Sequence, residues 1–385
     1  SCTSSFNMIQ FFLHRKFWLP IVLIIGIAVV LEFLLRAGIY DGLIKPKSYL
    51  GNAVYREKAI RDFGLENVHW VTIGDSRLDW GIEHEKILKL QKDKGINHLR
   101  MSFESSNFLA LQSTVEWSMA NMPNLEGVFL GVGENNFGHY DDVSKQYKVA
   151  WPFRDFINYD EFKYFHPYFW KFSYISRFAL YVYFFDIKEL FQKSMIRFRQ
   201  ISHYQSKEHS DIFSFKRDLP DDICEFELNS IQQCVETAKK KMGQVENKQA
   251  FNFIQLVCGN DYSQRRAQNN TPFHKKTAEE QLQISNNWKK LFDKIFSNGK
   301  KLTVVLLPEH QMFNYAVKPT NSVETMNMVL DSYRSKLEFE VIDFRNLFVE
   351  DSAHKECEYF TDPLHLNNLG MTKLTQAIVE RLREK

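Results

Sequence analysis

The stretch VHWVTIGDSRLDWGIEHEKILKLQKDKGINHLRMSF, residues 68–103, decides the fold class. It begins with an apolar run at 68–73 that is typical of a buried strand. Helical spacing of apolar residues follows over 82–95 and ends in Gly95, and a second apolar run covers 96–103. Two strands joined by a helix through short connections indicate a βαβ unit, in which the strands are parallel.

The same alternation continues along the chain, stops near residue 137 and resumes near residue 277. In the helix that restarts it, Thr277 is a candidate N-cap and Glu280 stands three residues later, as in a capping box. The further elements that the pattern predicts are helices at 107–122, 277–299, 323–336 and 367–385, and strands at 125–133, 301–308 and 339–344. We therefore expect an α/β three-layer sandwich with a central five-stranded parallel sheet and a large insertion after strand three.

An apolar run, FWLPIVLIIGIAVVLEFLL, occupies residues 17–35 and is about as long as the 20 residues that cross a bilayer. His14, Arg15 and Lys16 precede it, so the positive-inside rule predicts a cytoplasmic N-terminus. A cleaved signal peptide is the alternative, but the run is long for one and no A-x-A-like site follows it. We expect one uncleaved transmembrane helix, with the remainder of the chain outside the cytoplasm.

These patterns divide the chain into six parts. Because Met8 stands just ahead of the apolar run, residues 1–7 are expected to be a cloning remnant. The expected parts are a cytoplasmic tail at 1–16, a membrane anchor at 17–36, a linker with a short helix at 37–66, the first part of the α/β core at 67–137, an aromatic-rich insertion at 138–276 and the second part of the core at 277–385.

The insertion contains FKYFHPYFWKFSYISRFALYVYFF, residues 162–185, which is dense in aromatic residues. Its Lys, Arg, His and Ser residues argue against a second membrane span. One interpretation is that it forms the insertion's own core. The other is an aromatic face at the membrane interface or against a membrane protein, because Tyr and Trp suit that boundary.

Composition excludes some functions. The 49 Lys and Arg residues against 47 Asp and Glu give a net charge of +2, which offers no electrostatic case for nucleic acid. None of the five cysteines forms a CxxC motif or a zinc-like spacing with histidine, and no metal or organic cofactor is implied. Cys224 and Cys234 could pair in an oxidising compartment.

Polar residues follow several of the predicted strands. They are Gly74-Asp75-Ser76 after the first strand, Glu104-Ser105-Ser106-Asn107 after the second, Gly133-Glu134-Asn135-Asn136 after the third, and Asp362 and His365 in FTDPLHLNNLG beyond the fifth. In an open α/β sheet, ligands bind at the carboxyl ends of the strands. We therefore expect these clusters to converge on one site.

The residue types in this set suit acyl chemistry. Ser76 would be the nucleophile, His365 the base that takes its proton, and Asp362 the acid that orients the imidazole. Hydrogen bonds to the oxyanion would come from the Ser76 N–H, the Ser105 N–H and the Asn135 side-chain amide. The plain alternative is that Ser76 only caps a helix. The other histidines near strand ends are His84, His139 and His310, and none of them combines an acid at the right spacing with a position before the terminal helix.

The segments GDS at 74–76, GENN at 133–136 and DPLH at 362–365 resemble blocks I, III and V of the SGNH (GDSL) hydrolase family, over roughly 67–137 and 277–384. The resemblance implies the same roles for Ser76, Asn135, Asp362 and His365. The family's second block normally supplies a glycine N–H where Ser105 stands here. The third block normally ends in Asp, where this chain has Asn136.

The layout of the chain is similar to that of the membrane-anchored SGNH proteins of the DltD type and of alginate O-acetylation. It consists of an N-terminal anchor, an SGNH core outside the cytoplasm and a large insertion after block III. Those proteins work beside a multi-spanning membrane-bound O-acyltransferase (MBOAT). The resemblance implies an acyltransferase of the inner membrane that moves an acyl group from a donor onto an envelope glycan or glycolipid. The alternatives are an esterase that deacylates such a glycan or lipid, and a non-catalytic binding subunit of an acylation complex.

Overall fold

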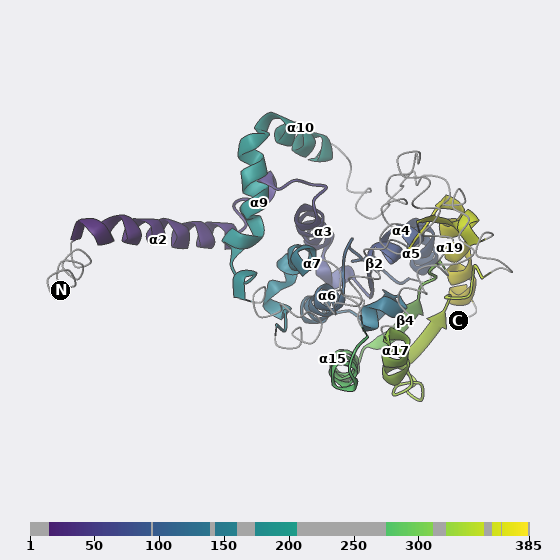
Figure 1. Cartoon of the computed structure of the whole chain (residues 1–385). Helices are drawn as coiled ribbons and strands as arrows, with labels where there is room; N and C mark the ends of the chain where they lie inside the picture. The colour runs from purple at the N-terminus through teal and green to yellow at the C-terminus, as the bar shows by residue number, and fades with distance from the viewer. Residues whose placement is uncertain are drawn as a thin grey trace, which may run out of the picture.

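The structure, a computed structural model, describes residues 15–93, 95–138, 143–159, 174–205, 275–310, 321–349, 356–362 and 364–383. Five parallel strands form the central sheet in the order β2-β1-β3-β4-β5 (Figure 1). Their bounds are Trp70–Gly74 for β1, His98–Arg100 for β2, Gly127–Val132 for β3, Lys301–Leu306 for β4 and Phe339–Asp343 for β5. All six residues of β3 are buried, as expected for a central strand covered on both faces. The predicted α/β fold with a five-stranded parallel sheet is confirmed.

Helices cover both faces of the sheet (Figure 1). On one face Phe108 of α6 packs edge-on against Trp288 of α15, with ring centroids 4.8 Å apart, while α5 and α19 pack against each other on the other face. The bounds are His84–Asp93 for α5, Phe108–Asn121 for α6, Ala278–Ser297 for α15, Ser322–Leu330 for α17 and Asn368–Arg383 for α19. The predicted capping box is present, since the Thr277 N–H donates to Glu280 and the Glu280 N–H donates to the Thr277 hydroxyl.

Helix α2, Arg15–Arg36, projects away from this body (Figure 1). Its segment Trp18–Arg36, 19 residues, is long enough and apolar enough to cross a membrane. Large apolar side chains along it are exposed, among them Leu19 at 70% and Phe33 at 69%. These exposed apolar side chains distinguish α2 from the helices of the α/β body, which bury most of theirs.

The segment 37–66 differs from the expected linker. Helix α3, Tyr49–Phe63, is 15 residues long and buries Leu50, Ala53 and Ile60. The Arg56 side chain is also buried and donates a hydrogen bond to Asp79 inside the body of the protein, 3.0 Å away. This segment is therefore in large part a core helix, which its many charged residues concealed.

Between β3 and α15 the described residues form further helices. Their bounds are Glu134–Phe137 for η3, Val143–Ala150 for α7, Trp151–Phe156 for η4, Ala179–Gln192 for α9 and Ser194–Gln205 for α10. Phe153 is fully buried and packs against Phe103 and Trp117 of the core. In the aromatic segment 162–185, residues 162–173 lie outside the described residues. Of the remainder, Tyr183 is buried, whereas Phe184 and Phe185 are more than half exposed.

Candidate active site

The site begins where β1 ends. Gly74 is the last residue of β1 and Ser76 is the first residue of the short helix α4, Ser76–Gly81. The N-cap of α4 is Asp75, whose carboxylate accepts a hydrogen bond from the Arg77 N–H at 2.9 Å. Because Asp75 fills the capping role, the Ser76 hydroxyl is not used to cap the helix.

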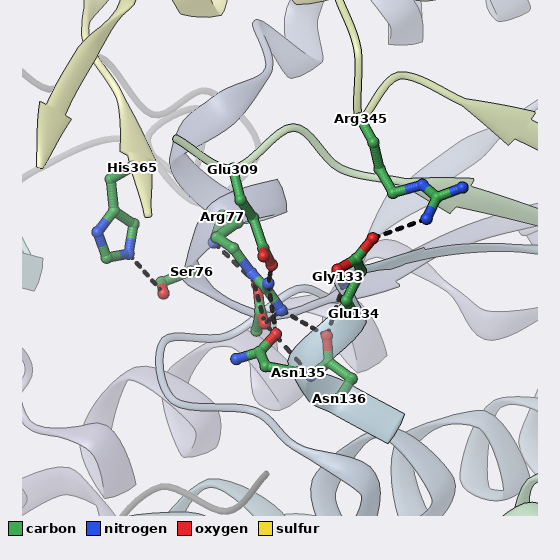
Figure 2. Close-up of polar contacts among 10 residues, drawn as sticks. Ser76, Arg77, Gly133, Glu134, Asn135, Asn136, Glu309, Arg345 and His365 are labelled. Atoms are coloured by element: carbon green, nitrogen blue, oxygen red, sulfur yellow. Dashed lines mark hydrogen bonds and ion pairs between the residues drawn. The ribbon is translucent and has the colours of Figure 1, made fainter. Parts of the chain in front are cut away.

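The Ser76 hydroxyl instead faces a histidine. Ser76 Oγ lies 2.8 Å from Nε2 of His365, a residue 289 positions later in the chain (Figure 2). His365 begins the two-residue strand β7, His365–Leu366, just before α19. The Trp80 ring packs on the imidazole, with centroids 4.3 Å apart and planes tilted by 34°. The structure thus holds a buried histidine at hydrogen-bond distance from a serine, with an aromatic ring to fix its orientation.

Asp362 is placed by its backbone alone. It ends β6, Phe360–Asp362, which pairs with β7 in antiparallel fashion, and the register sets Asp362 opposite His365. Residues directly opposite in an antiparallel pair have Cβ atoms about 4.5–5.5 Å apart. The Asp362 side chain lies outside the described part of the structure, so its role as the triad acid stays a prediction.

Asn135 lies in η3, after β3, and its side chain is oriented by Arg77. Arg77 Nη1 donates to Asn135 Oδ1 at 2.6 Å. A guanidinium group has only donors, so the amide oxygen must face Arg77 and the amide NH₂ must point the other way. Figure 2 shows this nitrogen on the side where Ser76 lies. The amide can therefore donate toward an oxyanion formed at Ser76.

Arg77 is the centre of this network. Its Nε donates to both Asp75 oxygens, at 3.1 and 3.0 Å, and it also contacts Asn136 and Glu309. Asn136 Oδ1 accepts a further hydrogen bond from the Gly133 N–H at 2.8 Å. Two carboxylates already flank the one guanidinium. The Asn136 amide oxygen accepts from Arg77 and from the Gly133 N–H without adding a third negative charge beside the one guanidinium.

Glu309 follows β4 and is 7% exposed. One of its oxygens accepts from Arg77, and the other, Oε2, is buried without a hydrogen-bond partner among the described residues. Burial raises the pKa of Glu309 to about 7, with the Arg77 charge opposing the rise and the charges of Glu134 and Asp75 adding to it.

Ser105 lies in the turn after β2, with φ of 60°. This is the left-handed region, which glycine adopts easily and other residues adopt at a cost of about 1–2 kcal/mol. The backbone at this position therefore favours glycine. Its hydroxyl is not required for the expected role, because a backbone N–H would be the donor.

The competing histidines have other surroundings. His310 Nε2 lies 4.0 Å from a Glu356 oxygen, and its ring meets Phe360 edge-on. Burial lowers the pKa of His84 well below its ordinary value, and the charges of nearby arginines add to this effect. His139 lies outside the described residues.

Three contributors to the site were not predicted from the sequence: Arg77, Trp80 and Glu309. Glu309 comes directly after a predicted strand and could have been found by the carboxyl-end rule that selected the other clusters. Arg77 and Trp80 carry no such signal.

In the described ranges, no group of three or more His, Cys, Asp or Glu side chains is placed to hold a metal ion. No family model and no curated protein sequence matches this chain.

Proposed function

We propose that this protein is a membrane-anchored serine acyltransferase that uses Ser76 and His365 to move an acyl group onto a cell-envelope glycan or glycolipid. The observation that carries the proposal is the 2.8 Å contact between Ser76 Oγ and His365 Nε2 at the carboxyl end of a parallel sheet. The Ser76 hydroxyl takes no part in capping α4, so helix capping does not account for its position beside the histidine.

In the first half-reaction, Ser76 Oγ attacks the acyl carbonyl while His365 Nε2 accepts the hydroxyl proton. The leaving group departs with that proton and an acyl-serine remains. In the second half-reaction an acceptor hydroxyl gives its proton to His365 and attacks the acyl carbon. The bond from that carbon to Ser76 Oγ breaks, the new ester leaves, and His365 returns the proton to Ser76 Oγ. Asp362 would stabilise the imidazolium in both halves.

Negative charge develops on the carbonyl oxygen in both half-reactions. The donors that we assign to it are the Ser76 N–H, the Ser105 N–H and the Asn135 amide. Loss of one such donor in serine hydrolases costs about 10²–10³ in kcat. Arg77 contributes indirectly, because it fixes which end of the Asn135 amide faces the oxyanion.

Two observations support a location outside the cytoplasm. Helix α2 can cross a membrane, and three basic residues precede its apolar segment. Cys357 is disulfide-bonded, which is typical of oxidising compartments; Cys224 and Cys234 lie outside the described residues. An envelope acceptor and an MBOAT donor of acyl groups fit this placement. The same residues would also serve an esterase, with water as the acceptor.

A serine-directed fluorophosphonate tests the catalytic assignment on the full-length protein. We expect it to label Ser76 in the wild type and to label neither Ser76→Ala nor His365→Ala. The melting temperature of Ser76→Ala should stay close to that of the wild type, because Asp75 and not Ser76 caps α4.

Ser105→Gly is the matched control, since glycine keeps the N–H and suits a φ of 60°. It should be labelled like the wild type and be more stable by about 1 kcal/mol. Labelling of Ser76→Ala at the wild-type rate would refute the nucleophile. Mass spectrometry of envelope polysaccharide and lipid, from cells with the wild-type protein and from cells with Ser76→Ala, then separates transfer from hydrolysis. If the protein is a transferase, the envelope of the Ser76→Ala cells carries fewer acyl groups. If it is an esterase, that envelope carries more.

A further inference from the structure

A second surface of the molecule is unexplained by the acyl chemistry. Helix α9 exposes four phenylalanine side chains to 56–82%: Phe178 just before its first turn, and Phe184, Phe185 and Phe191. Helical spacing places them along one side, opposite the buried Ala179, Val182 and Tyr183. We call these four phenylalanines the α9 face.

The start of α9 is attached to the membrane-crossing helix. The Glu32 carboxylate, in α2, accepts hydrogen bonds from the Ala179 and Leu180 N–H groups, both at 2.9 Å. Its Oε1 also accepts from Arg36 Nε at 2.7 Å. Glu32 is the one acidic residue of the apolar helix, and its role in the structure is to hold the first turn of α9.

This attachment sets the depth of α9. At 1.5 Å per residue, the 19 residues Trp18–Arg36 span about 28 Å, close to the thickness of the hydrocarbon core. Arg36 then stands at the edge of that core, and Glu32, four residues earlier, about 6 Å inside it. The first turn of α9, which is bonded to Glu32, therefore lies in the outer part of the hydrocarbon core, a few ångströms inside its boundary with the headgroups.

The direction of α9 keeps it at that level. Figure 1 shows α9 crossing the end of α2 at a steep angle, between the projecting α2 and the α/β core. Its buried side packs toward the core, against Trp151 and with Leu35 and Val54 in the same cluster. The α9 face lies on the opposite side of the helix from this cluster, and Phe185 stands beside Lys148 of α7.

Charges around the α9 face suit lipid headgroups. Arg177, Lys188 and Lys193 are exposed, and Lys148 Nζ lies 5.6 Å from the Phe185 ring centroid. The acidic residues of α9 are bonded inward: Asp186 accepts from Tyr40 and Arg197, and Glu189 from Lys45. Large apolar side chains accompanied by cations, with Lys188 on the same side of the helix between Phe184 and Phe191, are the pattern of an interfacial helix on an anionic lipid surface.

We propose that α9 is an interfacial membrane helix, whose four phenylalanines insert into the bilayer that α2 crosses. The molecule is then held by two elements, one across the membrane and one along it. Two attachments at different angles fix the orientation of the α/β core relative to the bilayer, which one helix alone does not.

The test measures immersion depth in the full-length protein, reconstituted in vesicles of phosphatidylcholine with phosphatidylglycerol. A nitroxide is coupled to azidophenylalanine introduced at Phe184 or at Phe191, which leaves the native cysteines untouched. The control site is Leu337, which is 99% exposed in the turn between α17 and β5. Power saturation then compares the accessibility of each nitroxide to oxygen, which enters lipid, and to NiEDDA, which stays in water.

We expect the oxygen-to-NiEDDA ratio at Phe184 and Phe191 to exceed the ratio at Leu337 severalfold. Both sites are more than half exposed, so the label should not disturb the core, and circular dichroism checks this. A ratio equal to that at Leu337 would place the face in water and overturn the proposal. Low accessibility to both reagents would mean that protein covers the face, and would overturn it equally.

Discussion

Replacing Glu309 with Gln should change how the stability of the protein depends on pH. Burial raises the pKa of Glu309 from 4.5 to about 7, which is about 2.5 units. At 1.36 kcal/mol per unit, this corresponds to roughly 3 kcal/mol. Between these two pKa values the folded protein retains a proton that the unfolded chain has lost. The free energy of unfolding should therefore fall by up to that amount as pH rises through this window.

Glu309→Gln removes this titration and retains an oxygen that can accept from Arg77. The variant should gain stability relative to the wild type as pH rises from about 5 to about 8, by up to roughly 3 kcal/mol. Denaturant unfolding of both proteins in the same detergent, at several pH values, gives the difference. Other titrating groups, such as the buried His84, cancel in this comparison because both proteins contain them.

The matched control is Glu126→Gln, at an exposed position just before β3. Its stability should follow that of the wild type at every pH. If the difference between Glu309→Gln and the wild type were the same at all pH values, the carboxyl would not titrate in this range, and the account of the Arg77 network would be wrong. Labelling of Ser76 should persist in Glu309→Gln, because Arg77 can still hold Asn135 by its amide oxygen.

Three further predictions concern the site and its location. Gly133→Ala should lower stability by about 1–3 kcal/mol and should also slow labelling, because the added Cβ would clash with Arg77 Nη1 and Glu309 Oε1; thermal melts and labelling rates measure the two effects. Trp80→Phe should slow labelling of Ser76 by about tenfold to a hundredfold with a smaller change in melting temperature, since the ring that packs on His365 is reduced; an unchanged rate would show that the contact has no positioning role. Alkaline phosphatase fused behind the C-terminus should be active, and activity of a cytoplasm-only reporter there would reverse the predicted orientation.

The sheet could be predicted because its signal is local. Each strand is a short apolar run bounded by polar turns. The start of the helix at Ala278–Ser297 is marked by the capping-box residues Thr277 and Glu280. Helix α3 was not recognised as part of the core, because its burial depends on partners distant in the sequence. Arg56 illustrates this: the side chain looks like a surface charge in the sequence, yet it is 6% exposed and bonded to Asp79.

The same distinction divides the site. Ser76, Asn135 and His365 could be selected because each follows a strand or precedes the last helix, and these positions meet at one end of the sheet. Arg77 could not, since an arginine after a serine has no special meaning until five acceptor atoms from four residues surround it. A sequence pattern does not show which distant residues form an ion pair. Arg77 and Glu309, which are 232 positions apart in the chain, are an example.

The two neighbouring residues Asp75 and Ser76 separate structural and chemical roles that a single serine could have combined. A serine at an N-cap uses its hydroxyl oxygen to accept from the helix, and a hydroxyl committed in this way is a poorer partner for a base. Here Asp75 accepts from the Arg77 N–H and also pairs with the Arg77 side chain, so the cap and the network that orients Asn135 share one carboxylate. Ser76, one residue later, keeps its backbone N–H at the helix start and its Oγ at 2.8 Å from His365. The β1–α4 turn therefore carries the helix cap, the proposed nucleophile and the arginine that orients the proposed oxyanion donor Asn135 in three consecutive residues.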